Sequence, residues 1–256
     1  MNEWLNKPGC FGALKLGEQP IVLAVVTGET KPQDVISAIV RGASGLEFRL
    51  DQGFEIRDGR CRAIDQMIDR EFTEIIHSVP RMMTVRIKSE GGAWPDEQHE
   101  ERMALIDTYK DRFHAIDLEL RDMEKHGAPK FLEWVKNNGV VINGSGHNFE
   151  TTVSDDELDY LDRLAEEFGV DVLKVAMMAK SRNDIHRLNR FLIGRRSKVA
   201  HRSVIPMGPL GKFARIAFPL LEPRSVFTYA SIGETVAPGQ FSVMDTRRLL
   251  NELGGR

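Results

Sequence analysis

Short runs of apolar, β-branched residues alternate with longer amphipathic segments along almost the whole chain. The first run, Ile21–Val26, is followed by the turn residues Thr27 and Gly28. After Pro32, apolar residues recur every three or four positions, which is the period of one helix face. This order of a strand and then a helix repeats eight times. The expected strands cover residues 21–26, 45–51, 82–87, 115–120, 140–143, 172–176, 202–206 and 225–230.

The segments between these runs carry helix start and stop signals. Ser154 stands three residues before Glu157 in the manner of a capping box, and Gly169 stands where that helix is expected to end. One helix is expected after Pro32 and another from about Pro209. The remaining expected helices cover residues 61–79, 97–112, 128–137, 154–169, 181–193 and 239–253.

Eight strand–helix units without a linker or a change in composition predict one closed (β/α)8 barrel. The alternative is a doubly wound open sheet. Its nucleotide-binding fingerprint, G-x-G-x-x-G after the first strand, is missing after Val26. We therefore expect residues 1–256 to form one barrel domain, with residues 1–19 as an irregular N-terminal extension.

Composition narrows the functional classes. With 41% hydrophobic and 29% charged residues, the chain has the composition of an ordinary globular protein. The net charge of -3 argues against a general nucleic-acid binder, so local arginines would have to hold any anionic ligand. The two cysteines form no metal or disulfide motif, and no signal peptide or membrane span is evident. These features predict a cytoplasmic protein without a metal site.

In a (β/α)8 barrel the active site lies at the carboxyl ends of the strands. Polar residues are therefore collected from the end of each expected strand and from the segment that follows it. They are Glu47 and Arg49, Arg86 with Glu90, Glu119, His147, Lys174, then Met207 and Arg215, and the turn Ala237–Gln240.

Lys174 and His147 are the residues among them that indicate a specific chemistry. Lys174 interrupts an apolar run, and burial lowers the pKa of an amine, which makes it a nucleophile toward carbonyls. His147, on the neighbouring expected strand, would supply the proton transfers that imine chemistry needs. Structural explanations remain open, since Lys174 could instead pair with a buried carboxylate and His147 could be satisfied by backbone.

The other candidates have structural alternatives too. Glu47 and Arg49 could form an ordinary ion pair inside the barrel, and Arg86 and Arg215 could lie on the surface. Residues 144–146 (Gly-Ser-Gly) resemble a phosphate cradle, but a flexible turn after the fifth strand is the simpler explanation. The functional interpretation requires that the fold bring all these residues together at the same end of the barrel.

Seven motifs together resemble the type I 3-dehydroquinate dehydratases, from about Ile21 to the C-terminus. The motifs are Glu47–Asp51, Thr84–Arg86 with Glu90–Gly92, Ile116–Glu119, Ser145–Phe149, Leu173–Ala176, Gly211–Arg215 and Ala237–Gln240. The resemblance implies a (β/α)8 barrel that dehydrates 3-dehydroquinate to 3-dehydroshikimate in the shikimate pathway. It also implies a cytoplasmic homodimer that acts on a small carboxylate substrate and needs no cofactor or metal.

The resemblance also implies roles for ten residues. Lys174 would form a Schiff base with the substrate ketone, His147 would be the general base and later the general acid, and Glu90 would orient His147. Arg215 and Gln240 would hold the substrate carboxylate. The ring and its hydroxyls would contact Glu47, Arg49, Arg86, Met207 and Phe149.

Three positions depart from the family pattern. Serine is usual where this chain has Val236 and Ala214, and aspartate often stands at the position of Asn148. Loss of hydrogen bonds near the carboxylate would weaken substrate binding by ~1 kcal/mol each. A related cyclic hydroxy-ketone acid as substrate, or a catalytically silent barrel that binds a polyol acid, are the alternatives to dehydroquinate dehydration.

Overall fold

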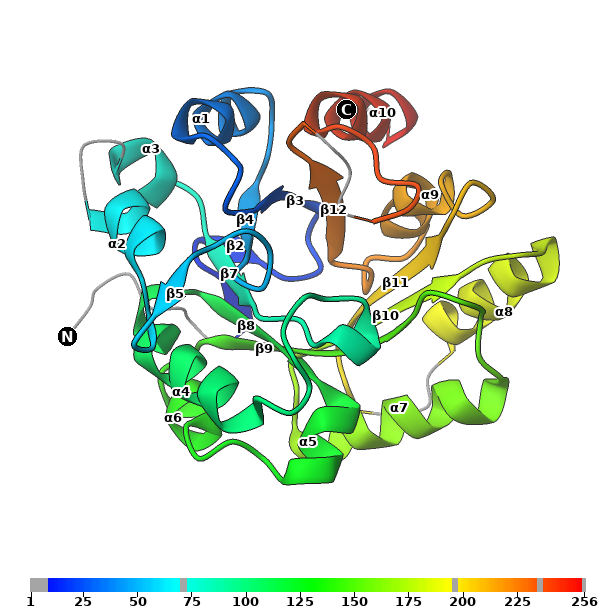
Figure 1. Cartoon of the computed structure of the whole chain (residues 1–256). Coiled ribbons are helices and arrows are strands. Elements are labelled where there is room, and N and C mark those ends of the chain that lie inside the picture. Colours follow the sequence, from blue (N-terminus) through cyan, green and yellow to red (C-terminus); the bar gives the residue numbers. More distant parts are fainter. Residues whose placement is uncertain (1–8, 70–72, 195–197, 234–236, 255–256) are drawn as a thin grey trace.

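Eight parallel strands surrounded by helices form the protein (Figure 1). The computed structural model describes residues 9–69, 73–194, 198–233 and 237–254. All eight strands expected from the sequence are present in one sheet. Along each strand, successive side chains point alternately toward the helices and toward the barrel interior. They are β3 (Ile21–Val26), β4 (Gly45–Arg49), β7 (Arg81–Thr84), β8 (Ala115–Glu119), β9 (Val141–Asn148), β10 (Val172–Met178), β11 (His201–Met207) and β12 (Phe227–Ser231).

The sheet order β11-β10-β9-β8-β7-β4-β3-β12 brings its two edge strands together. Arg202 at the start of β11 bridges to Ser225 just before β12, and the N–H of Val226 donates to the carbonyl of Arg202 at 3.0 Å. The ring of strands is therefore nearly closed, which confirms the predicted (β/α)8 barrel.

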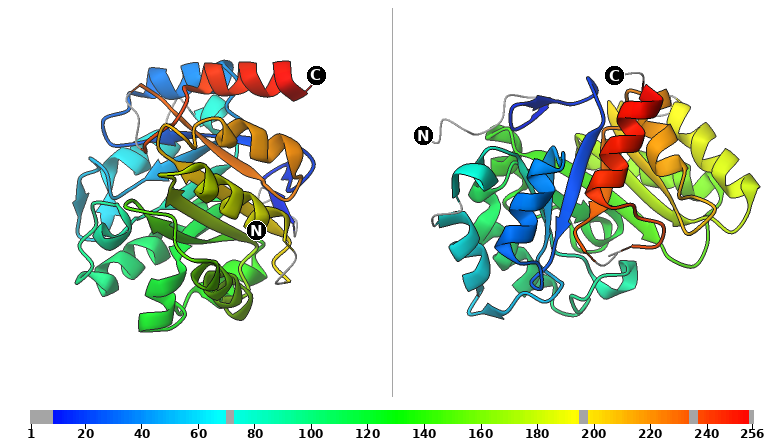
Figure 2. Two further views of the ribbon diagram at one scale, coloured as in Figure 1. Left: turned by 90° about the vertical axis from the view of Figure 1, so that its right-hand side faces the viewer. Right: turned by 90° about the horizontal axis from the view of Figure 1, so that it is seen from above.

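Helices lie outside the ring in every unit (Figures 1 and 2). None of those in the described residues has the length and apolarity needed to cross a membrane. The helices are α1 (Pro32–Val40), α2 (Arg62–Asp69), α3 (Thr73–His77), α4 (His99–Tyr109), α5 (Leu120–His126), α6 (Leu132–Asn137), α7 (Asp155–Phe168), α8 (Arg182–Ile193), α9 (Ala214–Leu221) and α10 (Val243–Gly254), with short 3-10 turns η1 (Lys88–Glu90) and η2 (Lys110–Arg112).

Helix limits agree with the expectation in some units and differ in others. Ser154 caps α7 by accepting from the N–H of Glu157, and Gly169 ends it with a positive φ of 62°. The expected helix 61–79 contains two helices, α2 and α3, and the sequence gave no indication of α5. Helix α9 begins at Ala214, later than expected, because the segment from Gly208 to Phe213 forms turns.

Part of the N-terminal extension is a small hairpin. Strands β1 (Cys10–Phe11) and β2 (Leu14–Lys15) pair in antiparallel fashion. The Phe11 side chain is fully buried and packs edge-on against Phe227, with ring centroids 5.4 Å apart. Phe227 is the first residue of β12, so the hairpin covers the end of the barrel where the strands begin (Figure 2). This leaves the opposite end, where the strands finish, for a ligand.

The barrel interior changes from apolar to polar along the strand direction. The layer beside the hairpin is apolar and includes Ile21, Met82, Ala115, Val141 and Phe227. Successive residues of a strand alternate between its faces, so the next inward position lies two residues further along. At that level most strands carry polar residues, whereas β3 stays apolar with Leu23 and Val25. The polar, buried positions are Glu47, Thr84, Asp117, Asn143, Ser145, Lys174 and Ser203.

Strand β9 is longer than expected and corrects one interpretation. The segment Gly144–Gly146 is neither a flexible turn nor a phosphate cradle, since β9 runs through it to Asn148. A Cβ on Gly144 would lie 2.8 Å from Val170, and one on Gly146 would lie 3.0 Å from Leu161 of α7. These glycines therefore permit close packing of the outer layer, which fixes His147 on a rigid strand.

Candidate active site

One cavity at the carboxyl ends of the strands collects all ten residues proposed for the site. It encloses about 50 Å³. The ten residues come from six strands and the segments after them, as expected for this end of a barrel. The predicted residues that line it are Glu47, Arg49, Arg86, Glu90, His147, Phe149, Lys174, Met207, Arg215 and Gln240.

Lys174 lies near the centre of this cavity, on β10, and is only 6% exposed. Its Nζ is 3.1 Å from Oδ2 of Asp117 and 3.6 Å from Oε1 of Glu47. The ring of Tyr229 lies on another side, with its centroid 4.2 Å from Nζ. The pairing with buried carboxylates that the sequence left open is therefore present, and it holds the amine inside the cavity.

Asp117 is the central acceptor of the site and was missed as a candidate from the sequence. Besides Lys174, it accepts hydrogen bonds from Arg86 at 2.7 Å, from the Ser145 hydroxyl at 2.6 Å and from the Asn143 amide at 2.8 Å. These partners hold the pKa of Asp117 well below its usual value despite complete burial. Its position two residues before Glu119 on one strand was the signal that could have identified it.

Arg86 is buried rather than on the surface, with 2% of its area exposed. It follows β7 directly and donates from Nη1 to Glu119 at 2.8 Å and to Ser145 at 2.6 Å. The neighbouring carboxylates raise its pKa against the opposing effect of burial, so it is a permanent cation. The hydrogen bonds of its side chain are made to Asp117, Glu119 and Ser145.

His147 and Glu90 form a pair on one side of the cavity. Oε2 of Glu90 lies 2.9 Å from Nδ1 of His147 and accepts the backbone N–H of His147 at 3.0 Å. Both contacts orient the imidazole and leave Nε2 for a ligand. Burial, together with the charges of Arg86 and Lys174, lowers the pKa of His147 well below its usual value, so the ring is neutral and its free nitrogen can accept a proton.

Glu90 is expected to control the pH dependence of this pair. Burial and the charge of Glu119 raise the pKa of Glu90 to about 8. Because the base-competent form has an ionised Glu90 accepting from Nδ1, kcat/KM of the native enzyme is expected to rise with pH and to level off above about 8. In Glu90→Gln this inflection should disappear, while Glu124→Gln on the surface serves as control. An unchanged pH profile in Glu90→Gln would contradict this role.

Arg215 is a buried cation without a carboxylate partner among the described residues. It lies in α9, is 5% exposed, and its Nη2 donates to the carbonyl of Pro238 at 2.9 Å. Its Nε is buried with no hydrogen-bond partner in the described part of the structure. Burial lowers its pKa to about 10. A guanidinium in this state is suited to bind an anionic ligand.

The remaining candidates complete the wall of the cavity. Arg49 pairs with Asp51 through two bonds of 2.9 and 2.8 Å and not with Glu47, so the ion pair considered from the sequence was assigned the wrong partner. Glu47 instead accepts from the Thr84 hydroxyl at 2.8 Å. The Phe149 ring lies almost parallel to that of His147, at 17° and 6.5 Å between centroids.

The departures from the family pattern are only partly described by the structure. Oδ1 of Asn148 accepts the N–H groups of Glu150 and Thr151, both at 2.9 Å, and so forms the turn after β9. Ala214 is fully buried beside Arg215 at the start of α9. Val236 lies outside the described residues.

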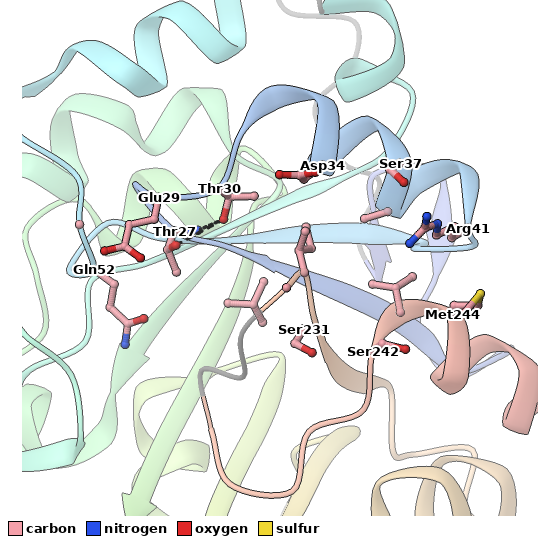
Figure 3. A pocket seen from close by; sticks show the side chains of 16 residues that line it. Thr27, Glu29, Thr30, Asp34, Ser37, Arg41, Gln52, Ser231, Ser242 and Met244 are labelled. Atoms are coloured by element: carbon pink, nitrogen blue, oxygen red, sulfur yellow. Dashed lines mark hydrogen bonds between the residues drawn. The ribbon is translucent and has the colours of Figure 1, made fainter.

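Two further cavities lie nearby. One, of about 690 Å³, lies between α1 and the start of α10 and contains none of the proposed catalytic residues (Figure 3). Hydroxyl groups dominate the labelled side chains there, and Thr27 and Thr30 bond to each other. The other, of about 390 Å³, shares Glu90 and His147 with the Lys174 cavity. Because the buried amine of Lys174 and the guanidinium of Arg215 line neither of these two cavities, the chemistry is assigned to the cavity around Lys174.

An eight-stranded barrel whose cavity holds a buried lysine, a histidine–carboxylate pair and a buried arginine is typical of the class of barrel enzymes that form imines. The model of the type I 3-dehydroquinase family matches residues 21–256, so the chain belongs to that family, for which Schiff-base chemistry is characteristic.

Named relatives agree with the family. The chain is 31% identical over 247 residues to a 3-dehydroquinate dehydratase of Methanosarcina barkeri, covering 95% of this chain and 98% of the relative. It is 28% identical over 249 residues to a catabolic 3-dehydroquinate dehydratase of Acinetobacter baylyi, covering 93% and 88%. The crystal structure of 3-dehydroquinate dehydratase from Geobacillus kaustophilus has a TM-score of 0.79 at 26% identity and covers 93% of this chain and 92% of that one.

Proposed function

We propose that this protein dehydrates 3-dehydroquinate to 3-dehydroshikimate through a Schiff base on Lys174. One observation carries the assignment to this site: a buried lysine, an acid–base pair and an arginine without a carboxylate partner line the same cavity. Membership of the type I 3-dehydroquinase family supports the reaction. Arginines and glutamates both line this cavity, so it can bind the carboxylate and the hydroxyl groups of a hydroxylated ketone acid.

The first chemical step is attack of the Lys174 amine on the substrate ketone, followed by loss of water to form a protonated imine. This imine keeps a positive charge close to the position of the ammonium. Asp117 and Glu47, at 3.1 and 3.6 Å from Nζ, therefore stabilise the intermediate as they stabilise the free lysine. The protein needs no rearrangement of these charged groups when the imine forms.

The second step is removal of a proton from the carbon next to the imine. Nε2 of His147 takes the proton, and the electron pair moves into the protonated imine. Glu90, 2.9 Å from Nδ1, compensates the imidazolium charge that develops. The electron pair then returns and expels the hydroxyl, which leaves as water after taking the proton from the same imidazolium, so one residue serves as base and acid in turn. Water finally hydrolyses the product imine and frees Lys174.

Direct turnover tests the proposal. Adding 3-dehydroquinate to the purified full-length protein should produce the absorbance of a conjugated enone carboxylate. A panel of related cyclic hydroxy-ketone acids should give slower turnover. If another member of the panel reacted faster, that compound and not 3-dehydroquinate would be the substrate, and the imine mechanism would still apply. Tight binding without turnover of any of them would favour the silent barrel.

Arg215 is expected to dominate binding of the substrate carboxylate. A charge-assisted bond of this kind contributes about 1.5–3 kcal/mol, which corresponds to a loss of about 10- to 100-fold in kcat/KM for Arg215→Gln. The loss should fall mainly on KM, because the carboxylate does not react. Arg215→Lys is the matched control and should retain part of the affinity. An unchanged KM in Arg215→Gln would place the carboxylate elsewhere in the cavity.

We also propose a cellular location and an oligomeric state for this protein. A cytoplasmic location agrees with Cys10 and Cys61 being free thiols, since a reducing compartment keeps thiols reduced. A homodimer is proposed from the family resemblance, and size-exclusion chromatography with light scattering would measure it. A related hydroxy-ketone acid remains the second candidate substrate, because Ala214 offers no hydroxyl beside Arg215.

A further inference from the structure

Two histidines and an aspartate meet on the outer layer of the barrel, away from the Lys174 cavity. His99 is the first residue of α4, whereas Asp122 and His126 lie one turn apart on α5. Nδ1 of His99 is 3.0 Å from Oδ2 of Asp122, and Nε2 of His126 is 3.8 Å from Oδ1. With one ligand atom taken from each residue, the three atoms all lie within 4.8 Å of one another. None of the three residues lines the Lys174 cavity.

One ring nitrogen in this cluster is not satisfied by a hydrogen bond. Nδ1 of His99 is buried and has no hydrogen-bond partner in the described residues, although a carboxylate oxygen lies 3.0 Å away. The two imidazole rings stack nearly in parallel, with centroids 4.0 Å apart and 18° between their planes. A buried imidazole nitrogen that faces a carboxylate oxygen without a hydrogen bond is stabilised when a cation lies between them.

The buried charges behind the cluster lead to the same conclusion. Asp122 is 8% exposed and accepts from Nη2 of Arg102 at 2.7 Å. Arg102 begins a continuous series of ion pairs that reaches Lys174. Within it three cations oppose four carboxylates, so one negative charge is left over. The cations are Arg86, Arg102 and Lys174, and the carboxylates are Glu47, Asp117, Glu119 and Asp122.

We propose that His99, Asp122 and His126 bind a divalent transition-metal ion of the Zn²⁺ type. Two imidazole nitrogens and one carboxylate suit Zn²⁺, Co²⁺ or Ni²⁺, whereas Mg²⁺ and Ca²⁺ prefer oxygen ligands. Three protein ligands leave a fourth position for water. Arg102 donates to the ligating carboxylate and orients it, as partners of metal ligands commonly do.

Binding an ion requires one side chain to turn. Bonds of about 2.0–2.1 Å at tetrahedral angles place ligand atoms roughly 3.3 Å apart. The contact of His99 with Oδ2 of Asp122, at 3.0 Å, and that of His126 with Oδ1, at 3.8 Å, lie on either side of that value. The ion must also lie in the plane of each ligating ring, which the stacked arrangement does not allow. The His126 side chain is 29% exposed at the end of α5, so it can rotate out of the stack toward the ion. Asp122 and Arg102 are fixed by burial and stay in place.

Calorimetric titration of the full-length protein with ZnCl₂ after removal of metals tests the site. We expect one ion per chain, and a weaker or absent response to Mg²⁺. His99→Gln and His126→Gln should each reduce Zn²⁺ affinity by about tenfold or more. His186→Gln, an exposed histidine on α8, is the matched control and should bind like the native protein. Circular dichroism verifies that each variant is folded.

Two outcomes would overturn the site: no binding by the native protein, or native affinity in both His99→Gln and His126→Gln. If either variant fails to fold, the visible absorption spectrum of Co²⁺ added to the native protein tests the site instead. Intense visible absorption of four-coordinate cobalt with nitrogen ligands supports the site, and the weak spectrum of hydrated Co²⁺ contradicts it. Neither result depends on turnover of 3-dehydroquinate, so failure of the proposed function leaves this test unaffected.

Discussion

Lys174→Arg should abolish dehydration of 3-dehydroquinate, with kcat/KM falling by about 10⁴-fold or more, as in other enzymes that lose a nucleophile. Arginine preserves the positive charge beside Asp117 and Glu47, so the barrel should still fold. A guanidinium cannot form the imine, however, so no protonated imine is available to accept the electron pair when the proton is removed. The measurement is the initial rate of enone formation under saturating and limiting substrate.

Borohydride trapping identifies the bond itself. Reduction of the native protein during turnover should add the mass of the reduced substrate adduct to the peptide that contains Lys174. The Lys174→Arg protein should show no adduct under the same conditions. A modified peptide elsewhere in the native chain, or none at all with turnover intact, would show that the reaction does not pass through Lys174. Lys180→Arg, an exposed lysine just after β10, controls for nonspecific effects of the substitution.

His147→Gln should separate imine formation from elimination. Removing a general acid–base group costs about 10²- to 10⁴-fold, and the loss should fall on kcat. The glutamine amide can still bond to Glu90, so the wall of the cavity keeps its shape. Because Lys174 is untouched, the imine should form and accumulate.

The distinguishing measurement is again trapping. Borohydride should label Lys174 in His147→Gln as fully as in the native protein, while enone formation is nearly lost. If the variant lost both labelling and turnover, His147 would be needed to form the imine as well. If kcat stayed at the native value, another group would be the base. His186→Gln controls for changes in surface histidines.

The residues of this site could largely be predicted from the sequence, because the fold class determines where the ends of the strands lie. Once eight strands alternate with helices, the carboxyl ends of all strands meet at one end of the barrel. Residues such as Lys174, His147 and Arg215 could then be grouped although they lie far apart in the chain. All ten candidates do line one cavity, which is the part of the prediction with the strongest physical basis.

The contacts inside the cavity could not be read from the chain. Asp117 reaches Lys174, 57 positions away, and Arg86, 31 positions away, only because the register of neighbouring strands aligns these positions. A shift of one residue would turn each side chain to the other face of its strand. The sequence alone therefore left Lys174 without its partner and suggested Glu47 as the partner of Arg49.

The sequence by itself determined the order of the eight barrel strands, the barrel and the chemical types gathered at one end of it, because these depend on local periodicity and on a topology common to all such barrels. Tertiary structure decided which groups touch. Close packing of Val170 against Gly144, and of Leu161 in α7 against Gly146, requires glycine at these two strand positions. The meeting of α4 with α5 placed His99 beside Asp122 and His126. Such contacts depend on how the helices pack around the strands, which no local pattern specifies.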